Sequence, residues 1–280
     1  MKKQEFLESK KDEIEKYVRD GKTYKEIANI YNIHHSIVSL IVRKYKFSHI
    51  NENYFEKIDT EAKAYFLGFI FADGSIFRSN SKDSYVLELG IHIKDLYILE
   101  KFKTEVCPSH KIYFKKEACV LSIGSKKIAE SLIKFGITPN KSHNIFLIFN
   151  IDMIPNTLIR HFIRGYFDGD GHVGITRPKY FRKRQNILHE YLRLNRFGFT
   201  SSHLNFLEYI KNLFEEMGYK SRFYKRDKYT NNLYFNLNKK NSHIIYDYFY
   251  KNSNFFLTRK KQSFEIGLNN TEVNNQISQG

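Results

Sequence analysis

Two segments of the chain share one hydrophobic pattern, in which an apolar run stops at an acidic residue followed by glycine. The first is Tyr65–Ile76, with the sequence YFLGFIFADGSI, and the second is His161–Val173, with the sequence HFIRGYFDGDGHV. An apolar run without proline predicts a helix, and the glycine predicts where that helix stops. The pattern therefore predicts two helices, each with an acid at its C-terminus.

The two segments are copies of one another. A shift of 97 residues aligns Gly68 with Gly165 and also Asp73 with Asp170. Small residues lie four positions apart in both copies, at Gly68, Ala72, Gly165 and Gly169. Residues four apart share one helix face, so each helix has a face on which a second backbone can approach closely. We expect the two helices to pack on these faces around a pseudo-twofold axis, which brings the terminal acids together.

Asp73 and Asp170 then occupy an unfavourable place. A helix C-terminus is the negative end of the macrodipole and disfavours a carboxylate by up to about 1 kcal/mol. Two such carboxylates side by side also repel each other, and a divalent cation between them relieves both effects. The alternative is a pair of unrelated helices with solvated acids. That interpretation is the weaker one, because the two copies are in register.

These residues resemble the LAGLIDADG homing endonucleases in their single-chain form. LGFIFADG keeps the glycine, the alanine and the final Asp-Gly, with Phe71 at the first acid of the family pattern. RGYFDGDG keeps both acids, with Arg164 and Gly169 in small-residue places. The resemblance covers roughly Asn53–Leu268. It implies an α+β fold of two pseudo-symmetric αββαββα repeats that form a DNA-binding saddle, with the second acid of each motif at the metal.

Composition agrees with a folded protein that binds a polyanion. The chain has 280 residues, of which 41% are hydrophobic, and a net charge of +16. Charge alone does not separate nucleic acid from an anionic membrane. The sequence has no run of about 18 apolar residues and no signal-peptide pattern at its amino terminus, which predicts a cytoplasmic, nuclear or organellar protein that is not secreted. Cys107 and Cys119 are expected to be reduced structural residues.

The segment Lys2–Lys46 predicts a separate helical unit. Thr23 and Glu26 have the spacing of a capping box, and a tight turn at Asn32 leads into a further helix. This order resembles the resolvase-type helix-turn-helix. It places His35, Ser36 and Ser39 toward bases, and Arg43, Lys44 and Lys46 near phosphates. The alternative is a helical bundle that binds another protein. The basic end of the last helix favours DNA.

The rest of the chain predicts four strands after each acid. The runs are 75–80, 85–93, 111–118 and 119–124 in the first repeat, and 172–178, 190–202, 221–228 and 232–238 in the second. Helices are expected at 95–106, 126–135, 203–218 and 241–252. The predicted domains are 1–47, a linker at 48–60, repeats at 61–155 and 156–268, and a disordered tail at 269–280. Alternation within the strands suggests a basic face for DNA, with candidates Arg78, Lys115, Arg193, Arg196, Arg222, Lys225, Arg226 and Lys228.

Each repeat ends in a basic segment. The resemblance implies a lysine near each active centre, and by position these are Lys141 and Lys260, with Lys261 close behind. A cation beside the attacked phosphate stabilises charge in the transition state, while the alternative is a phosphate clamp without a catalytic role. Asp168 and Asp170 also resemble the start of a calcium loop, but His172 stands at an oxygen-ligand position, so we interpret Asp168 as a structural acid.

The function implied by the resemblance is site-specific double-strand DNA cleavage by a monomer. Asp73 and Asp170, with Ala72 and Gly169 beside them, would hold Mg²⁺, which Mn²⁺ could replace, whereas Ca²⁺ would support binding without cleavage. The resemblance further implies cleavage across the minor groove, short 3′ overhangs, a long asymmetric target and a role in intron or phage mobility. Two alternatives remain open: a regulator that has lost cleavage, and a maturase acting on intron RNA.

Overall fold

The computed structural model describes residues 9–45, 47–79, 84–139, 141, 149–182, 187–190 and 192–268. The chain forms two compact units. One contains residues 1–57 and 76–131, and the other contains residues 58–75 and 132–280. The helix of the first repeat therefore belongs to the unit of the second repeat, which differs from the predicted boundary near residue 155. The cause is the packing of that helix against its copy, described below.

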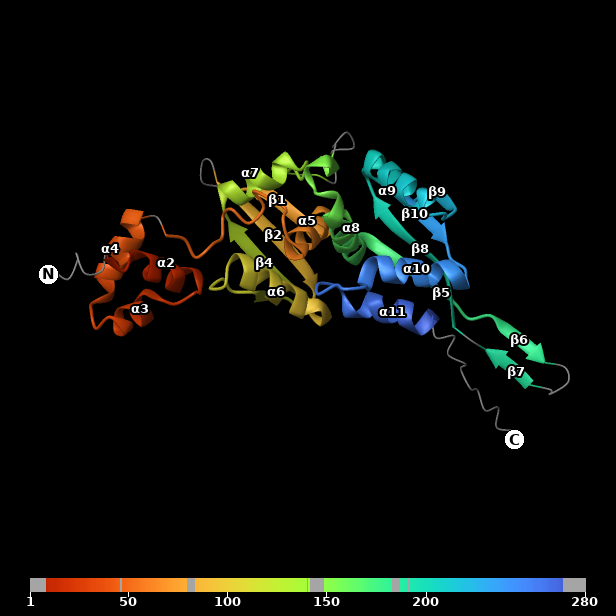
Figure 1. Ribbon diagram of the computed structural model, residues 1–280, viewed down its shortest axis with the longest axis horizontal. Coiled ribbons are helices and arrows are strands. Elements are labelled where there is room, and N and C mark those ends of the chain that lie inside the picture. The colour runs from red at the N-terminus through yellow and green to blue at the C-terminus, as the bar shows by residue number, and fades with distance from the viewer. Residues whose placement is uncertain are drawn as a thin grey trace. The chain divides into compact units, whose positions relative to one another are not determined.

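The amino-terminal helices are α2 (Lys11–Arg19), α3 (Tyr24–Ile30) and α4 (His35–Tyr45) (Figure 1). The predicted capping box is present, because the Thr23 side chain accepts from the Glu26 N–H while the Glu26 carboxylate accepts from the Thr23 N–H. The three helices close a small apolar core made of Ile14, Val18, Ile27, Ala28, Val38, Ile41 and Val42. The basic end of α4 lies outside this core, at Arg43 and Lys44.

The first sheet has the strand order β1-β2-β4-β3. Its strands are β1 (Gly74–Arg78), β2 (Tyr85–His92), β3 (Tyr113–Phe114) and β4 (Ala118–Gly124), accompanied by η1 (Ile93–Asp95), α6 (Leu96–Val106) and α7 (Lys126–Lys134). Leu87, Leu89 and Ile91 lie directly opposite Ile123, Leu121 and Cys119, and all six are buried. One face of the sheet is therefore core. Cys107 and Cys119 are both buried and unpaired.

The residues before the first repeat do not form the polar linker predicted for 48–60. Tyr54 and Phe55 are buried, and the Phe55 ring lies 6.2 Å from the ring of Phe102 on α6. The Asn51 N–H donates to the Val106 carbonyl at 2.7 Å. These two aromatic side chains bury enough apolar surface to hold the stretch against the helix.

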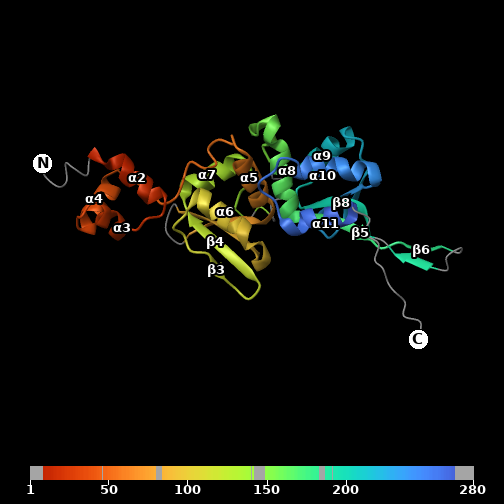
Figure 2. The ribbon, with the colours of Figure 1, turned by 60° about the horizontal axis from the view of Figure 1, so that its bottom comes forward.

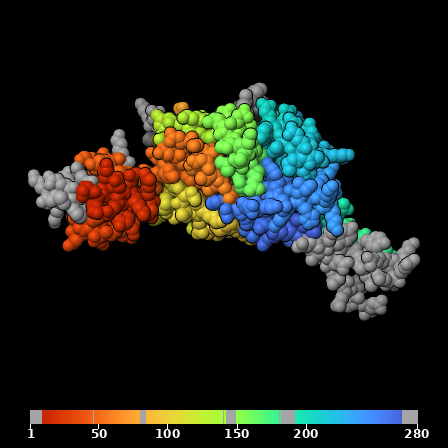
Figure 3. All heavy atoms as spheres, viewed as in Figure 1, coloured from red at the N-terminus to blue at the C-terminus, as the bar shows by residue number. Residues whose placement is uncertain are grey.

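The second sheet has the order β5-β8-β10-β9. Its strands are β5 (Gly171–Thr176), β8 (Arg193–Ser201), β9 (Ser221–Lys225) and β10 (Asn231–Asn236), with α9 (Leu204–Glu216), α10 (Lys239–Tyr250) and α11 (Thr258–Leu268). Phe197, Phe199 and Phe235 are fully buried on the face that packs against these helices. Figure 3 shows α10 and α11, in blue, beside the green α8. The prediction of a mixed fold with two antiparallel sheets is confirmed.

Two elements of the second repeat were not predicted. One is a hairpin of β6 (Lys179–Arg182) and β7 (Ile187–Glu190), which leads away from β5 and β8 (Figure 2). The other is α11, whose basic start carries no strong apolar periodicity. The hairpin lies in the connection between β5 and β8, where the first repeat has only residues 79–84 between β1 and β2. The predicted tail at 269–280 lies outside the described residues.

Helices α5 (Glu61–Asp73) and α8 (Asn156–Asp170) are the two predicted copies, and the short η3 (Ile151–Met153) precedes α8. The Thr60 side chain caps α5 by accepting from the Lys63 N–H. Almost every residue of α5 from Ala64 to Phe71 is buried, so the helix is apolar on all sides because other elements surround it. Within the described ranges, no helix has the length and apolar character needed to cross a membrane.

Candidate functional site

Helices α5 and α8 pack through reciprocal glycine contacts. A Cβ atom added to Gly68 would lie 1.9 Å from the carbonyl oxygen of Phe162, and one added to Gly165 would lie 1.9 Å from that of Tyr65. The same shift of 97 residues that relates Gly68 to Gly165 relates Tyr65 to Phe162. Equal contacts exchanged between equivalent residues are the signature of a twofold relationship.

The contact continues to the ends of the two helices. A Cβ atom on Gly169 would lie 2.4 Å from the Ala72 Cβ and 3.2 Å from an Asp73 carboxylate oxygen. The structure thus places all four small residues of the repeat at the α5–α8 interface. Because the backbones remain in contact up to the last turn, the terminal acids Asp73 and Asp170 are held at the same end of the helix pair.

The two acids are accessible and electrostatically strained. Asp73 is exposed and Asp170 is partly buried. The surrounding protein removes part of the water around Asp73, and together with the charge of Asp170 it raises the pKa of Asp73 to about 6. Partial burial also raises the pKa of Asp170, against the opposing effect of Lys141 and Lys260. Near neutral pH, a cation beside these carboxylates would offset the cost of keeping both ionised.

Lys141 binds the C-terminus of α5. Its Nζ donates to the carbonyl oxygens of Ile70 and Ala72, both at 2.8 Å, and also to that of Phe71. The side chain is buried, and this burial lowers the pKa of Lys141 to about 8 against the opposing effect of the two acids. An ammonium group on the last carbonyls of a helix compensates the negative end of its dipole.

Lys260 does the same for α8. Its Nζ donates to the carbonyl oxygens of Phe167, Gly169 and Gly171, the last at 2.7 Å. The shift of 97 residues relates two of these carbonyls to those of Ile70 and Ala72, so Lys141 and Lys260 are structural equivalents although they are 119 residues apart in sequence. Burial lowers the pKa of Lys260 to about 8 as well.

The charges are paired across the helix interface. Among the lysines, Lys260 has the larger effect on the pKa of Asp73, whereas Lys141 has the larger effect on that of Asp170. Arg259 also acts on Asp73, and Arg226 acts on Asp170. Each acid therefore shares its surroundings chiefly with the lysine that caps the other helix. Lys261, the neighbouring candidate, instead faces Glu265 at 3.8 Å.

Asp168 has a structural place, as its sequence context suggested. It is fully buried, and its Oδ2 accepts from the Tyr65 hydroxyl at 2.8 Å and from the Leu257 N–H at 2.7 Å. It thus joins α5, α8 and the segment before α11. At the equivalent position of α5, Phe71 stacks on Phe149 with ring centroids 4.5 Å apart.

The second sheet has a polar face opposite its aromatic core. Register places His172, Gly198, Tyr234 and Arg222 in one row across the four strands, and Gly174, Arg196 and Asn236 in the next. The Arg196 guanidinium lies over the Tyr234 ring at 4.6 Å. Side chains alternate along a strand, so Lys225 lies on the opposite face from Arg222. Arg222 and Lys225 therefore do not share one face of the sheet, and a DNA contact of Lys225 stays a prediction.

The remaining predicted DNA contacts are scattered. Arg78 ends β1 and donates to the Tyr85 hydroxyl at 3.3 Å, and Lys115 lies in the turn between β3 and β4. Arg226 and Lys228 lie in the turn between β9 and β10, and Arg193 is exposed at the start of β8. On the first sheet, the face opposite the core presents Glu88 and Ser122, which hydrogen-bond to each other. The described faces of the two sheets therefore differ in charge.

Residues 157–252, which include most of the second repeat, match the LAGLIDADG-like domain family. A variant of I-SmaMI with a lysine replaced by alanine is similar in structure, with a TM-score of 0.50, 17% identity, and coverage of 72% of this chain and 88% of that one. The chain has the LAGLIDADG homing endonuclease fold.

The chain is also similar to two further proteins. The meganuclease I-AabMI bound to uncleaved DNA gives a TM-score of 0.48 at 15% identity, covering 72% of this chain and 87% of that one. A curated relative, the probable translation initiation factor IF-2 of Methanocaldococcus jannaschii, is 29% identical over 181 residues. That match covers 62% of this chain and 13% of the relative, so the chain corresponds to a small part of it.

The donor set of the two terminal acids fits a hard divalent cation. Asp73 and Asp170 offer carboxylate oxygens at an accessible place, and Mg²⁺ commonly uses one or two carboxylates with water and substrate phosphates completing its shell. In the described part of the chain, no three acidic, histidine or cysteine side chains group around a common metal position. The carbonyl oxygens of Ala72 and Gly169 each accept a hydrogen bond from a lysine. A carbonyl oxygen has a second lone pair that could bind a metal ion, so the predicted metal contact of these two residues stays a prediction.

In the amino-terminal helices, α4 presents most of its predicted DNA contacts to solvent. His35, Ser36, Arg43 and Lys44 are exposed and Ser39 is partly exposed, while Lys46 lies outside the described residues. Ser36 is within 2.8 Å of the His34 ring nitrogen, so it already has a local partner. Exposure fits either a DNA-reading or a protein-binding helix.

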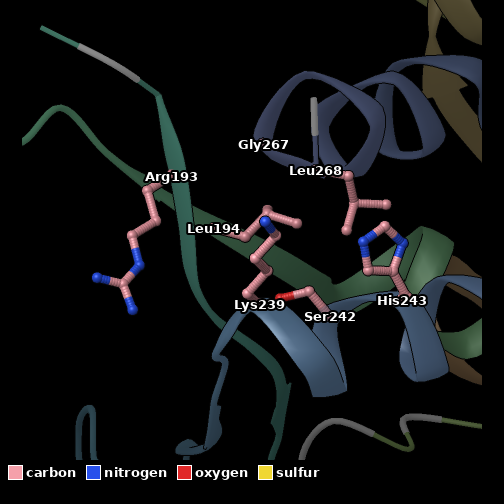
Figure 4. Close-up of a pocket in the computed structure, with 7 residues that line it drawn as sticks. All are labelled: Arg193, Leu194, Lys239, Ser242, His243, Gly267 and Leu268. Carbon is pink, nitrogen blue, oxygen red and sulfur yellow. The ribbon is translucent and has the colours of Figure 1, made fainter. Parts of the chain in front are cut away.

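A pocket in the described part of the second unit lies away from the acids. It has a volume of about 190 Å³ and is lined by Arg193, Leu194, Lys239, Ser242, His243, Gly267 and Leu268. Lys239, Ser242 and Leu194 converge on it from α10 and β8, whereas Arg193 is turned away beyond the strand (Figure 4). It lies against the helices and contains neither carboxylate, so it is not the candidate site.

The sequence analysis also missed a buried ion pair between α5 and α8. Arg164 was interpreted only as a departure from the small-residue pattern, yet it is fully buried and pairs with Glu61 at 2.7 Å. An arginine in an apolar helix requires buried acceptors, and this signal could have pointed to it. Its partner Glu61 could not be named without the tertiary structure.

Proposed function

We propose that this protein is a site-specific, metal-dependent DNA endonuclease. The observation that carries the proposal is the convergence of Asp73 and Asp170 at the ends of two equivalent helices, with a buried lysine beside each. Raised pKa values mark carboxylates that benefit from a cation. Both acids come from one chain, which supports a monomer that acts on the two strands of one duplex.

The protein groups have separate roles in this proposal. Asp73 and Asp170 would hold Mg²⁺ through their carboxylate oxygens. When bound there, such an ion would supply Lewis-acid chemistry for phosphodiester hydrolysis, and the two carboxylates would orient it. Lys141 and Lys260 keep their positive charge at the helix ends, which favours the charge that develops on the attacked phosphates. Cleavage across the minor groove with 3′ overhangs is the outcome that the family resemblance leads us to expect.

The polar face of the second sheet supports DNA as the substrate. Arg196, Arg222, Tyr224 and Tyr234 line it, and arginines suit bidentate contacts to guanine in the major groove. The hairpin of β6 and β7 extends this half, and Arg177 and Lys179 at its base are exposed. We propose that this hairpin and the amino-terminal α4 contact DNA outside the central target, which makes the target long and asymmetric.

The test is a selection of cleaved sites from a randomised DNA library with Mg²⁺, followed by sequencing of bound and of cut species. Recovery of one cleaved site, cut on both strands and dependent on metal, is the expected result. A site that is enriched by binding but never cut would support a regulator instead. Binding of structured intron RNA with no DNA site would support the maturase alternative.

A further inference from the structure

A carboxylate at the start of α5 binds the segment that precedes α11. Glu61 Oε1 accepts from the Asn254 N–H at 2.7 Å and from the Phe255 N–H at 3.3 Å, while Oε2 accepts from the Asn254 side chain at 3.0 Å. Burial acts to raise the pKa of Glu61, but these hydrogen bonds and Arg164 outweigh it, so the pKa is lowered. Glu61 is therefore an ionised clamp on this segment.

Arg164 completes the clamp from α8. Its guanidinium is fully buried and donates to Glu61 at 2.7 Å, to the Phe255 carbonyl at 2.7 Å and to the Ser253 hydroxyl at 2.8 Å. It also donates to the Phe249 carbonyl at 3.0 Å, at the end of α10. A buried guanidinium with an ionised partner and several backbone acceptors is fixed in direction, because losing any one partner leaves polar groups without hydrogen bonds.

The clamped segment leads directly into Lys260. Asp168 accepts from the Leu257 N–H at 2.7 Å, and the Leu257 carbonyl in turn accepts from the N–H of Lys260 at 3.1 Å. Residues 253–257 are thus held at one end by Glu61 and Arg164 and at the other by Asp168. The position of the Lys260 backbone, and hence of its Nζ, depends on this short segment.

The residues that form this clamp have apolar counterparts in the other repeat. Under the shift of 97 residues, Glu61 corresponds to Leu158, Arg164 to Leu67, and Asp168 to Phe71. The polar residues that hold the segment before Lys260 are all replaced by apolar ones at the equivalent positions. The two halves of the site therefore differ in what supports them, although their lysines make equivalent contacts.

We propose that the Glu61–Arg164 pair positions Lys260 and not Lys141, so that its loss slows the hydrolysis of one DNA strand more than that of the other. This inference rests on the proposed function. Glu61 and Arg164 are positioning residues, because they act through Lys260 and do not reach the reacting atoms. A purely structural role would lower both strand rates together.

The experiment measures the two strand rates separately, on a selected target labelled at each 5′ end, with the full chain and Mg²⁺. Lys260→Met and Lys141→Met first identify the strand that depends on each lysine. Glu61→Gln keeps the shape of the side chain but removes its charge and one acceptor. We expect it to slow the Lys260-dependent strand by about tenfold more than the other, since small displacements of a positioned group have effects of this order. Nicked plasmid should accumulate before linear plasmid.

Two further variants complete the design. Asp59→Asn removes an exposed carboxylate near the same helix start, paired with Lys63 at 2.8 Å, and should leave the strand ratio unchanged. Asn254→Ala removes the side-chain contact to Glu61 and keeps the backbone N–H contact, so it should shift the ratio less, in the same direction. It provides a test if Glu61→Gln does not fold. Equal slowing of both strands by an otherwise folded variant overturns the inference alone. Absence of cleavage by the unsubstituted protein overturns the proposed function and the inference with it.

Discussion

Lys260 caps helix α8 but acts more strongly than Lys141 on Asp73, the acid at the end of α5. The converse holds for Lys141, which caps α5 and has the larger effect on Asp170. This exchange follows from helices that meet through glycine, because close backbones bring the end of one helix next to the support of the other. Each acid of the candidate site thus interacts more strongly with the lysine that caps the other helix than with the lysine that caps its own.

Substituting either acid should separate binding from cleavage. Asp73→Asn or Asp170→Asn removes a metal-binding charge without removing a DNA contact, so double-strand cleavage should be lost. Binding to the selected site in Ca²⁺ should remain within a few-fold. Gel-shift and cleavage assays on the same preparations check this. Full cleavage by either variant would show that the acids were wrongly assigned.

Stability in the absence of metal should depend on pH through Asp73. The pKa of Asp73 in the folded protein is raised to about 6, so folding favours the protonated acid. The resulting contribution to the free energy of unfolding is fully present below the pKa of an unfolded aspartate, and it is lost as the pH rises through about 6. Asp73→Asn should therefore melt higher than the unsubstituted protein at pH 7.5 and at a similar temperature near pH 4. Mg²⁺ should stabilise the unsubstituted protein more at pH 7.5 than at pH 5. Thermal melts that show no such crossover would contradict the raised pKa.

The glycine contact should not tolerate a methyl group. Gly68→Ala places a Cβ atom on the Phe162 carbonyl, so the helices must separate, at a cost of about 3 kcal/mol or more. Gly124→Ala is the matched control, because a Cβ there meets nothing within 4 Å. Urea unfolding of the two variants measures the difference. Equal stability of both would show that the α5–α8 interface is wrong.

Two cations on one strand should differ in their effect on DNA binding. Arg222 lies on the polar face of β9 and Lys225 on the opposite face, so Arg222→Ala should weaken binding and lower the salt slope by about 1, the value expected for one lost phosphate contact. If Arg222 reads a base, sequence preference should relax as well. Lys225→Ala should change neither. Binding isotherms at several salt concentrations measure both effects. A larger effect of Lys225→Ala than of Arg222→Ala would place the DNA on the face of β9 that carries Lys225.

The amino-terminal unit should extend the footprint to one flank. A chain that begins at Ser48 keeps the packed residues Tyr54 and Phe55 but lacks Arg43 and Lys44. It should still cut, with weaker binding, a shorter footprint and a shallower salt dependence, because tethered binding adds affinity without changing the chemistry. Footprints of the full and shortened proteins on one site measure this. Identical footprints and affinities would show that α4 does not contact this DNA and would favour the protein-binding alternative.

The sequence by itself determined the repeat, the two helix ends with their acids and most strands, because these depend on local periodicity and on residues four apart. Thr23 with Glu26 is likewise local, and the predicted capping box is present. The linker prediction failed because polar neighbours masked Tyr54 and Phe55, whose burial depends on α6.

Only the tertiary structure decided which side chains meet. The equivalence of Lys141 and Lys260 was hidden by insertions between the repeats, and it emerges from the carbonyls that each one binds. The placement of Lys225 follows from strand register, and a single step along a strand reverses the face. The Glu61–Arg164 pair joins residues 103 positions apart. The sequence can indicate that a buried charge needs a partner, but the tertiary structure determines which residue that partner is.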